Sequence, residues 1–191
     1  CVLPDELTEE QKNSLNIIDR LIFILEARSE TVSPTVTLSN ASGDKIIDVN
    51  LLEVKKRLLA DISANSQTFK DKEFTDSTGN LKITCGVPLL VTEEQTDKVL
   101  AEKTKIDPAN ATQVAEFVSE SFAAEILKTL KTVTINGTET VDLSKQTLEF
   151  KIQVLDSLPA SVVRHVVDYV EEYRNVLDGC LVVQGIGIPV D

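Results

Sequence analysis

The sequence predicts an α+β fold in which amphipathic helices pack with short antiparallel β-hairpins. Apolar residues recur at helical spacing in several long segments, most clearly over residues 160–176. Short segments rich in Thr and Val are separated by turn sequences such as Asn136-Gly137. Elements of both kinds alternate along the 191 residues, so we expect one α+β domain over 1–191, with a soft boundary near 88–92 and an extended C-terminal tail at 181–191.

The clearest break in the helical pattern lies at residues 157–160. Pro159 lacks a backbone N–H and biases Leu158 away from helical geometry, so one helix should end there and another should begin close to Pro159. In the second helix the apolar side chains share one face, and most charged side chains fall on the other. This apolar face either covers the core of the protein or binds a partner.

The partner-binding alternative gives a hypothesis for a protein interface. The tail enters this hypothesis because an extended apolar segment needs a strand partner, either in its own sheet or in another chain. The predicted interface residues are Pro159, Val162, Val163, Val166, Val170, Tyr173, Ile186 and Ile188.

The N-terminal third contains two predicted helices separated by a hairpin. Thr8 and Gln11 have the spacing of a capping box, which predicts a helix from Glu9 to about Arg28. Alternating segments at 35–38 and 45–49 flank the turn sequence 40–44 and predict the hairpin. Asn50 then provides an N-cap for a helix that ends near residue 63.

The middle of the chain repeats this alternation. Segments 68–75 and 81–87 flank the turn sequence 76–80, and alternation places Cys85 on the apolar face of the second strand. A capping-box sequence at 92–95 predicts a helix to about Lys103. Asp107 and Pro108 suit the start of a long helix that ends near Lys131.

The last hairpin and the helix after it complete the prediction. Asn136-Gly137 favours a tight turn between strands at 132–135 and 138–142. Segment 148–155 fits both a strand, by strict alternation to Val154, and a helix. We favour the helix because Ser144 offers an N-cap and Leu155 breaks the alternation.

Composition restricts the classes of partner. The chain is 42% hydrophobic and carries 19 basic against 31 acidic residues, a net charge of −12. Such a charge repels nucleic acid and anionic lipid surfaces. No apolar run approaches the roughly 20 residues that cross a bilayer. We therefore expect protein partners, with no nucleic-acid binding and no membrane insertion.

Residue types that carry catalysis are sparse. The single histidine, His165, lies on the flank of a polar helix face, and the seven glycines stand in turns without a phosphate-binding sequence. Cys85 and Cys180 are isolated, so we expect reduced and buried thiols, with a disulfide between them as the alternative. We predict no catalytic residue, cofactor or metal, and thus no enzyme.

The N-terminal residue allows a second interpretation of function. The chain begins with Cys1 and contains no Met, so residue 1 is not expected to be a translation start. A cysteine in this place is also the residue that is lipid-modified in bacterial lipoproteins. The alternative function is therefore a lipid-anchored cell-envelope binding domain with Cys1 as the modified residue.

Two stretches resemble a known family. The first runs from Leu15 through Asp19-Arg20 to Arg28-Ser29, before the Thr-rich hairpin, and the second runs from Ser157-Leu158-Pro159 to residues 168–171. They are similar to segments of the baseplate hub assembly proteins of T-even-like contractile-tailed phages. The resemblance implies a non-enzymatic assembly factor or structural component of the tail baseplate. It implies other tail proteins as partners, allows an oligomer within an assembly without setting a copy number, and implies a location in the virion or in the host cytoplasm during phage assembly.

Overall fold

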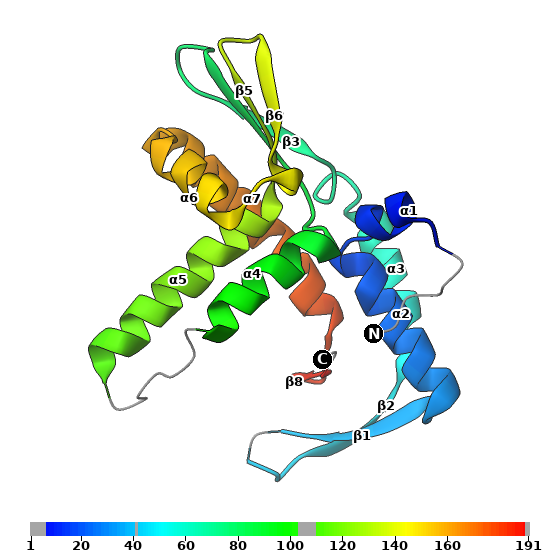
Figure 1. Ribbon diagram of the computed structural model, residues 1–191. Helices are drawn as coiled ribbons and strands as arrows, with labels where there is room; N and C mark the ends of the chain where they lie inside the picture. Colours follow the sequence, from blue (N-terminus) through cyan, green and yellow to red (C-terminus); the bar gives the residue numbers. More distant parts are fainter. Residues whose placement is uncertain (1–6, 41, 103–109, 190–191) are drawn as a thin grey trace. The chain divides into compact units, whose positions relative to one another are not determined.

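The computed structural model describes residues 7–40, 42–102 and 110–189 and confirms the α+β fold, with 56% helix and 21% strand (Figure 1). The chain divides into two compact units. Unit 1 comprises residues 1–69 and 171–191, and unit 2 comprises residues 70–170. Residues 88–92, where the sequence suggested a soft boundary, lie inside unit 2.

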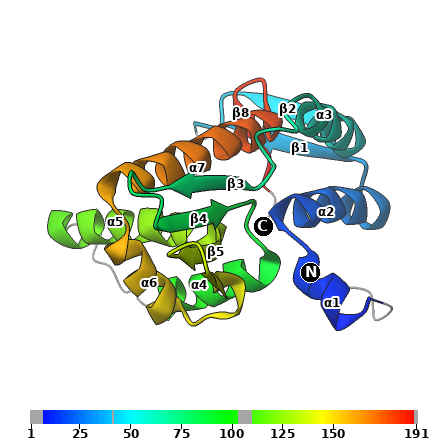
Figure 2. The ribbon, with the colours of Figure 1, turned by 90° about the horizontal axis from the view of Figure 1, so that it is seen from above.

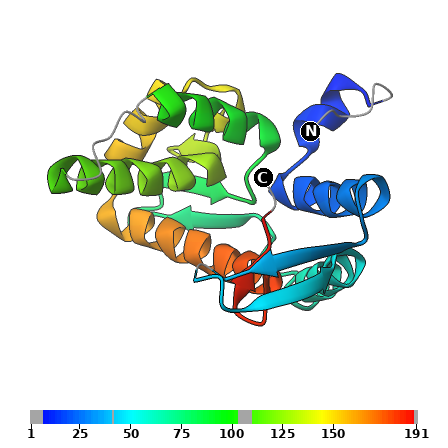
Figure 3. The same ribbon diagram turned by 90° about the horizontal axis from the view of Figure 1, so that it is seen from below.

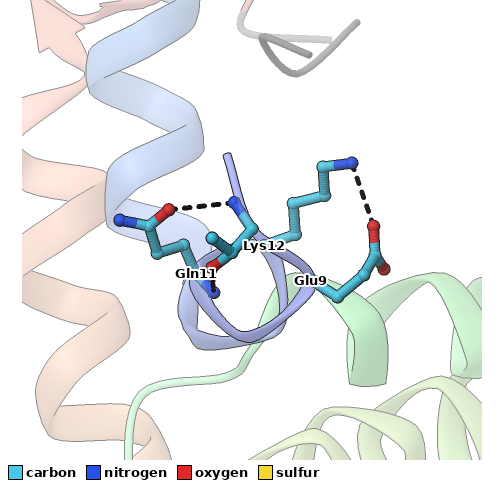
Figure 4. Close-up of polar contacts among 4 residues, drawn as sticks. Glu9, Gln11 and Lys12 are labelled. Atoms are coloured by element: carbon cyan, nitrogen blue, oxygen red, sulfur yellow. Dashed lines mark hydrogen bonds and ion pairs between the residues drawn. The ribbon is translucent and has the colours of Figure 1, made fainter. Parts of the chain in front are cut away.

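Unit 1 begins with two short helices where the sequence predicted one. Helix α1 (Glu9–Ser14) has the predicted capping box, in which the Thr8 hydroxyl and the Gln11 side chain each accept the other's backbone N–H (Figure 4). Helix α2 (Ile17–Thr31) begins at a second capping box, formed by Asn16 and Asp19. The prediction of an unbroken helix was wrong because the Asn16 side chain binds the backbone N–H groups of the following turn and starts a new helix.

The first hairpin and the helix after it are confirmed. Strands β1 (Thr35–Ser39) and β2 (Ile46–Asn50) pair antiparallel, with Thr37 opposite Asp48. Asn50 caps helix α3 (Leu51–Ala64) by accepting the backbone N–H groups of Leu52 and Glu53. Helices α2 and α3 pack together, and their buried side chains form the core of this part of unit 1: Ile18, Leu21, Leu25, Leu51, Val54 and Leu58.

The C-terminal tail forms a small hairpin and is not a single extended segment. Strands β7 (Val182–Val183) and β8 (Ile186–Gly187) pair antiparallel. The chain reverses at Gln184 and Gly185, which have φ values of 50° and 81°. Beyond the strands, the Ile188 N–H donates to the Leu181 carbonyl at 2.8 Å. The prediction of an extended tail was wrong because the glycine permits a two-residue turn of the kind that closes hairpins.

Unit 2 contains a four-stranded antiparallel sheet in the order β3-β4-β5-β6. Its strands are β3 (Lys72–Thr75), β4 (Leu81–Cys85), β5 (Leu130–Ile135) and β6 (Glu139–Asp142). The predicted turn at Asn136-Gly137 is confirmed, with φ values of 52° and 67°. Cys85 lies on the apolar side of β4 and is 0% exposed, as the alternation predicted.

Two helices of unit 2 begin at residues other than the predicted ones. Helix α4 (Leu90–Glu102) starts before Thr92, whose side chain is buried inside the first turn, so the predicted cap at Thr92 was wrong. Helix α5 (Ala111–Thr129) starts after Asn110, which accepts the backbone N–H groups of residues 112 and 113. The predicted start at 107–108 lies outside the described residues. Helix α5 ends at Thr129 because the next residues join the sheet as β5.

The break at residues 157–160 is confirmed. Helix α6 (Leu148–Ser157) is the helix favoured over a strand, but its cap is Thr147, whereas Ser144 lies in the short 3-10 helix η1 (Leu143–Lys145). Helix α7 (Ala160–Cys180) follows, and the Pro159 carbonyl accepts the first N–H groups of its ladder. In Figures 2 and 3, α7 runs alongside β3, and α4 and α5 lie on the opposite side of the sheet.

Candidate functional site: the apolar face of α7 and the C-terminal hairpin

The apolar face of α7 is buried. Val162, Val166, Val170 and Tyr173 are each at most 1% exposed. Val163 is half-buried, and Pro159 alone of the predicted α7 interface residues is exposed. This face therefore belongs to the core of the protein, the first of the two alternatives, and is not a free docking surface.

Neighbouring side chains of α7 contact strand β3. The ring of His165 stacks on Phe74 with 5.8 Å between centroids and 13° between planes. Phe74 also meets Tyr169 in a tilted arrangement, and the Lys72 ammonium lies 5.3 Å from the centre of the Tyr169 ring. Aromatic and cation–π contacts of this kind stabilise packing between elements. The only histidine thus has a structural explanation.

The two remaining predicted interface residues lie in the C-terminal hairpin. Ile186 and Ile188 are each 6% exposed, so the hairpin directs its aliphatic side chains into the protein. The hairpin lies beside strands β1 and β2 in Figure 3. These isoleucines therefore find their apolar contacts within this chain.

Three basic side chains hold the hairpin, and we call them the basic clasp: Arg28 from α2, Lys45 from the turn before β2, and Arg57 from α3. Arg28 Nη1 donates to the Pro189 carbonyl at 2.6 Å, and Lys45 Nζ donates to the Gln184 carbonyl at 2.5 Å. The Arg57 guanidinium donates to the carbonyls of residues 180 and 182, the latter at 3.0 Å. All three thus bind the main chain of the hairpin.

Sequence reasoning missed the basic clasp. Its residues are separated from their partners by 123 to 161 positions, so no local period or spacing connects them. Hydrogen bonds from charged donors are stronger than those between neutral groups, and Arg57 makes two of them. The one available signal was the tail, which is uncharged from Gly179 to Pro189 and too apolar to remain in water.

Sequence reasoning also missed a pair of exposed apolar side chains on α5. Val118 is 60% exposed and Phe122 is 43% exposed, and their spacing of four residues places them on the same side of the helix. We call this pair the α5 surface. Helical spacing of the apolar residues predicted the helix, but spacing by itself does not say which of these residues are covered.

Both described cysteines are free and buried, as predicted. Burial raises the pKa of the Cys85 thiol to about 12. Burial is also the main cause that raises the pKa of Cys180 to about 11, and a hydrogen bond from its thiol to Asp61 adds to it. Both side chains are therefore neutral thiols at pH 7, which makes them poor nucleophiles.

The described residues contain neither a metal-binding cluster nor a membrane-spanning helix. Within them, no three His, Cys, Asp or Glu side chains are grouped so that they could hold a metal ion. None of the helices in the described part of the chain has the length and apolarity needed to cross a membrane. Cys1 lies outside the described residues. No protein family, curated protein or solved structure matches this chain.

Proposed function

We propose that this chain is a non-enzymatic protein-interaction subunit, an assembly factor or structural component of a contractile phage tail baseplate. The baseplate assignment comes from the two stretches that resemble the hub assembly family. Residues in both have structural roles here. Asp19 caps α2, Arg28 belongs to the basic clasp, and Leu158 and Tyr169 are buried. Residues with such roles support the fold, so proteins that share the fold are expected to share them.

The observation that carries the interaction role is the α5 surface. A helix of a soluble domain usually directs its large apolar side chains inward. In α5 that pattern holds for Ile126 and Leu127, which are each 4% exposed, but it fails one to two turns earlier at Val118 and Phe122. Uncovered valine and phenylalanine side chains on one side of a helix suit packing against another protein.

The test combines purified protein with phage assembly. Val118→Asp together with Phe122→Asp should leave the thermal unfolding midpoint within a few degrees of the wild type, because both side chains are exposed. The same variant should fail to complement a contractile-tailed phage that lacks this gene, measured as infectious titre and as assembled baseplates in electron micrographs.

The matched control is Ser119→Asp, since Ser119 lies on the same helix and is exposed. It adds a negative charge without removing an apolar side chain, so it should complement normally. Normal complementation by the Val118 and Phe122 variant would exclude the α5 surface as the contact. Assembly of normal tails in the absence of the gene would exclude the baseplate function itself.

A further inference from the structure

The turn between strands β5 and β6 places an asparagine directly before a glycine. Asn136 and Gly137 are the two central residues of this turn, with φ values of 52° and 67°. Both are exposed, and so are Ile135 and Thr138 on either side. Of all the asparagines in the sequence, Asn136 is the only one that a glycine follows. Solvent therefore reaches both the side-chain amide of Asn136 and the peptide bond that follows it.

The two groups of this turn that could react with each other are not held by hydrogen bonds. Within the described residues, the Asn136 side chain has no hydrogen-bond partner, and the Gly137 N–H donates to no group. Gly137 lacks a side chain that would hinder the approach of its nitrogen to Asn136 Cγ. A Cβ at Gly137 would meet no atom within 4 Å, so no other part of the described chain covers the turn.

The turn before β4 has the opposite arrangement around another exposed asparagine. The Asn80 carbonyl accepts the Asn136 N–H at 2.6 Å, so the two turns are neighbours. The nitrogen that follows Asn80 belongs to Leu81, and its N–H donates to Asp76 Oδ1 at 2.9 Å. This nitrogen has both a hydrogen bond to lose and a branched side chain beside it. Asn80 is therefore a natural comparison for Asn136 within the same sheet.

We propose that Asn136 is a site of covalent modification, which deamidates without an enzyme through a succinimide. A base in the solvent removes the proton of the Gly137 N–H, and the nitrogen forms a bond to Asn136 Cγ. The bond from Cγ to Nδ2 breaks, and Nδ2 leaves as ammonia with a proton from the solvent. Water then opens the imide at either carbonyl, adding its hydroxyl to the carbon and its hydrogen to the Gly137 nitrogen. The products are aspartate and isoaspartate, whatever the function of the protein.

The fold slows this reaction by a limited factor. The Gly137 nitrogen reaches Cγ only when the backbone of Asn136 rotates, and this rotation opens the turn. Opening breaks one backbone hydrogen bond, from the Thr138 N–H to the Ile135 carbonyl at 3.2 Å. The net free energy of one such bond corresponds to a factor of at most about 10 in rate. Asn136 should thus react in the folded protein.

The isoaspartate product changes the hairpin more than the aspartate product does. Isoaspartate puts the side-chain methylene into the main chain, so the turn becomes longer. A two-residue turn sets the register of its strands, which here pairs the buried Val133 with Val141. Isoaspartate should therefore loosen the pairing of β6 with β5. Aspartate tolerates a positive φ and should keep the turn.

The experiment incubates the purified full chain at pH 8 and 37 °C and measures deamidation by mass spectrometry of tryptic peptides. Asn136 is the only asparagine of peptide 132–145, and Asn80 is the only one of peptide 73–82. In the folded chain Asn136 should react at a rate within about tenfold of that in the free synthetic peptide 132–145, since one hydrogen bond must open. Asn80 should keep its amide over the same time. The Asn136 product should include isoaspartate, which a protein isoaspartate methyltransferase labels with a methyl group.

Asn136→Gly is the matched control, because it removes the amide and keeps a residue that accepts a positive φ. Its thermal unfolding midpoint should stay constant during the incubation, whereas that of the wild type should fall by a few degrees as isoaspartate accumulates. The proposal is wrong if Asn136 keeps its amide in the folded chain while the free peptide reacts, or if Asn80 reacts as fast as Asn136. A wild-type midpoint that stays constant as isoaspartate accumulates would overturn the effect on β6.

Discussion

At the scale of single residues, Gly86 lies where a larger side chain would displace a partly exposed ion pair. A Cβ at this position would overlap Asp71 Oδ1 and Lys131 Cε, which lie near the ends of flexible side chains. These two side chains form an ion pair at 2.7 Å directly beside the glycine. Gly86 also donates its N–H to the Thr129 carbonyl at 2.9 Å, so its backbone is fixed. The ion pair would have to move if a methyl group were added.

Gly86→Ala should therefore lower the free energy of unfolding by about 1 kcal/mol, a typical cost of overpacking and of a displaced partly exposed ion pair. Urea unfolding followed by circular dichroism measures this change. Gly179→Ala is the matched control, because a Cβ at Gly179 in α7 meets nothing within 4 Å and alanine favours helices. The cost of Gly86→Ala should shrink in a Lys131→Ala background. An equal cost in both backgrounds would contradict the contact with the ion pair.

The two buried thiols predict a dependence of stability on alkaline pH. The pKa values of Cys85 and Cys180 rise in the folded state to about 12 and about 11, from 9.0. Above pH 9 the unfolded chain loses these protons while the folded chain keeps them. The contribution of each thiol is thus complete below pH 9 and is lost as pH rises toward its folded pKa, by at most about 1.4 kcal/mol per pH unit.

Cys85→Ala with Cys180→Ala should accordingly show a smaller loss of unfolding free energy between pH 8.5 and 10 than the wild type does. Urea titrations at several pH values provide the comparison. The change of unfolding free energy with pH is measured within each protein, so the cost of the lost side-chain volume, which is present at every pH, cancels. Parallel pH profiles for the two proteins would show that the thiols ionise equally in the folded and unfolded states.

At the scale of elements, Lys128 joins α4 to α5. Its ammonium lies 2.8 Å from Asp97 of α4 and 2.9 Å from Glu125 of its own helix, and its side chain is 6% exposed. Burial alone would lower the pKa of Lys128, but the hydrogen bonds with Asp97 and Glu125 outweigh burial and raise it. This contribution to stability is therefore present below pH 10.5 and is lost as pH rises through the folded pKa.

Lys128→Ala should lower the unfolding free energy by about 1–3 kcal/mol, because two carboxylates lose a shared charged donor and the buried stem is removed. Thermal unfolding at pH 7 measures the effect. Lys98→Ala on α4 is the control, since Lys98 is exposed, and it should change the free energy by less than about 0.5 kcal/mol. Equal effects of the two substitutions would show that the contact between α4 and α5 contributes little.

At the scale of the whole molecule, α7 supplies residues to both compact units, 160–170 to unit 2 and 171–180 to unit 1. Its buried face should therefore be needed for folding rather than for docking. Val166 is 0% exposed, so Val166→Asp would place an unpaired carboxylate in the core. We expect loss of the folded state, seen as loss of the cooperative thermal transition.

Ser161→Asp provides the comparison, because Ser161 is exposed near the start of the same helix. A carboxylate in the first turn of a helix is favourable, so this variant should fold normally. A Val166→Asp protein that folds but fails to assemble would reverse the conclusion and restore the α7 face as a docking surface.

Most of the helices and strands could be predicted from the sequence, because their signals are local. The Asn136-Gly137 turn, the Asn50 cap and the break at Pro159 each depend on residues within one turn of the chain. The predicted helix starts were wrong where two signals competed. Asn16 starts a new helix inside a longer helical pattern, and Thr92, which belongs to a capping sequence, lies inside the first turn of α4. Periodicity identified an apolar face in α7 but could not say what covers it.

Which of these faces and segments remain exposed to a partner depends on how the chain folds in three dimensions. Burial depends on contacts between residues far apart in sequence, and no local pattern encodes such contacts. The α7 face is covered, whereas the α5 surface, which has the same kind of pattern, is exposed. The basic clasp likewise exists only after folding brings Arg28, Lys45 and Arg57 to one hairpin. This hairpin carries no charge, so no charge pattern in the sequence predicts its basic partners.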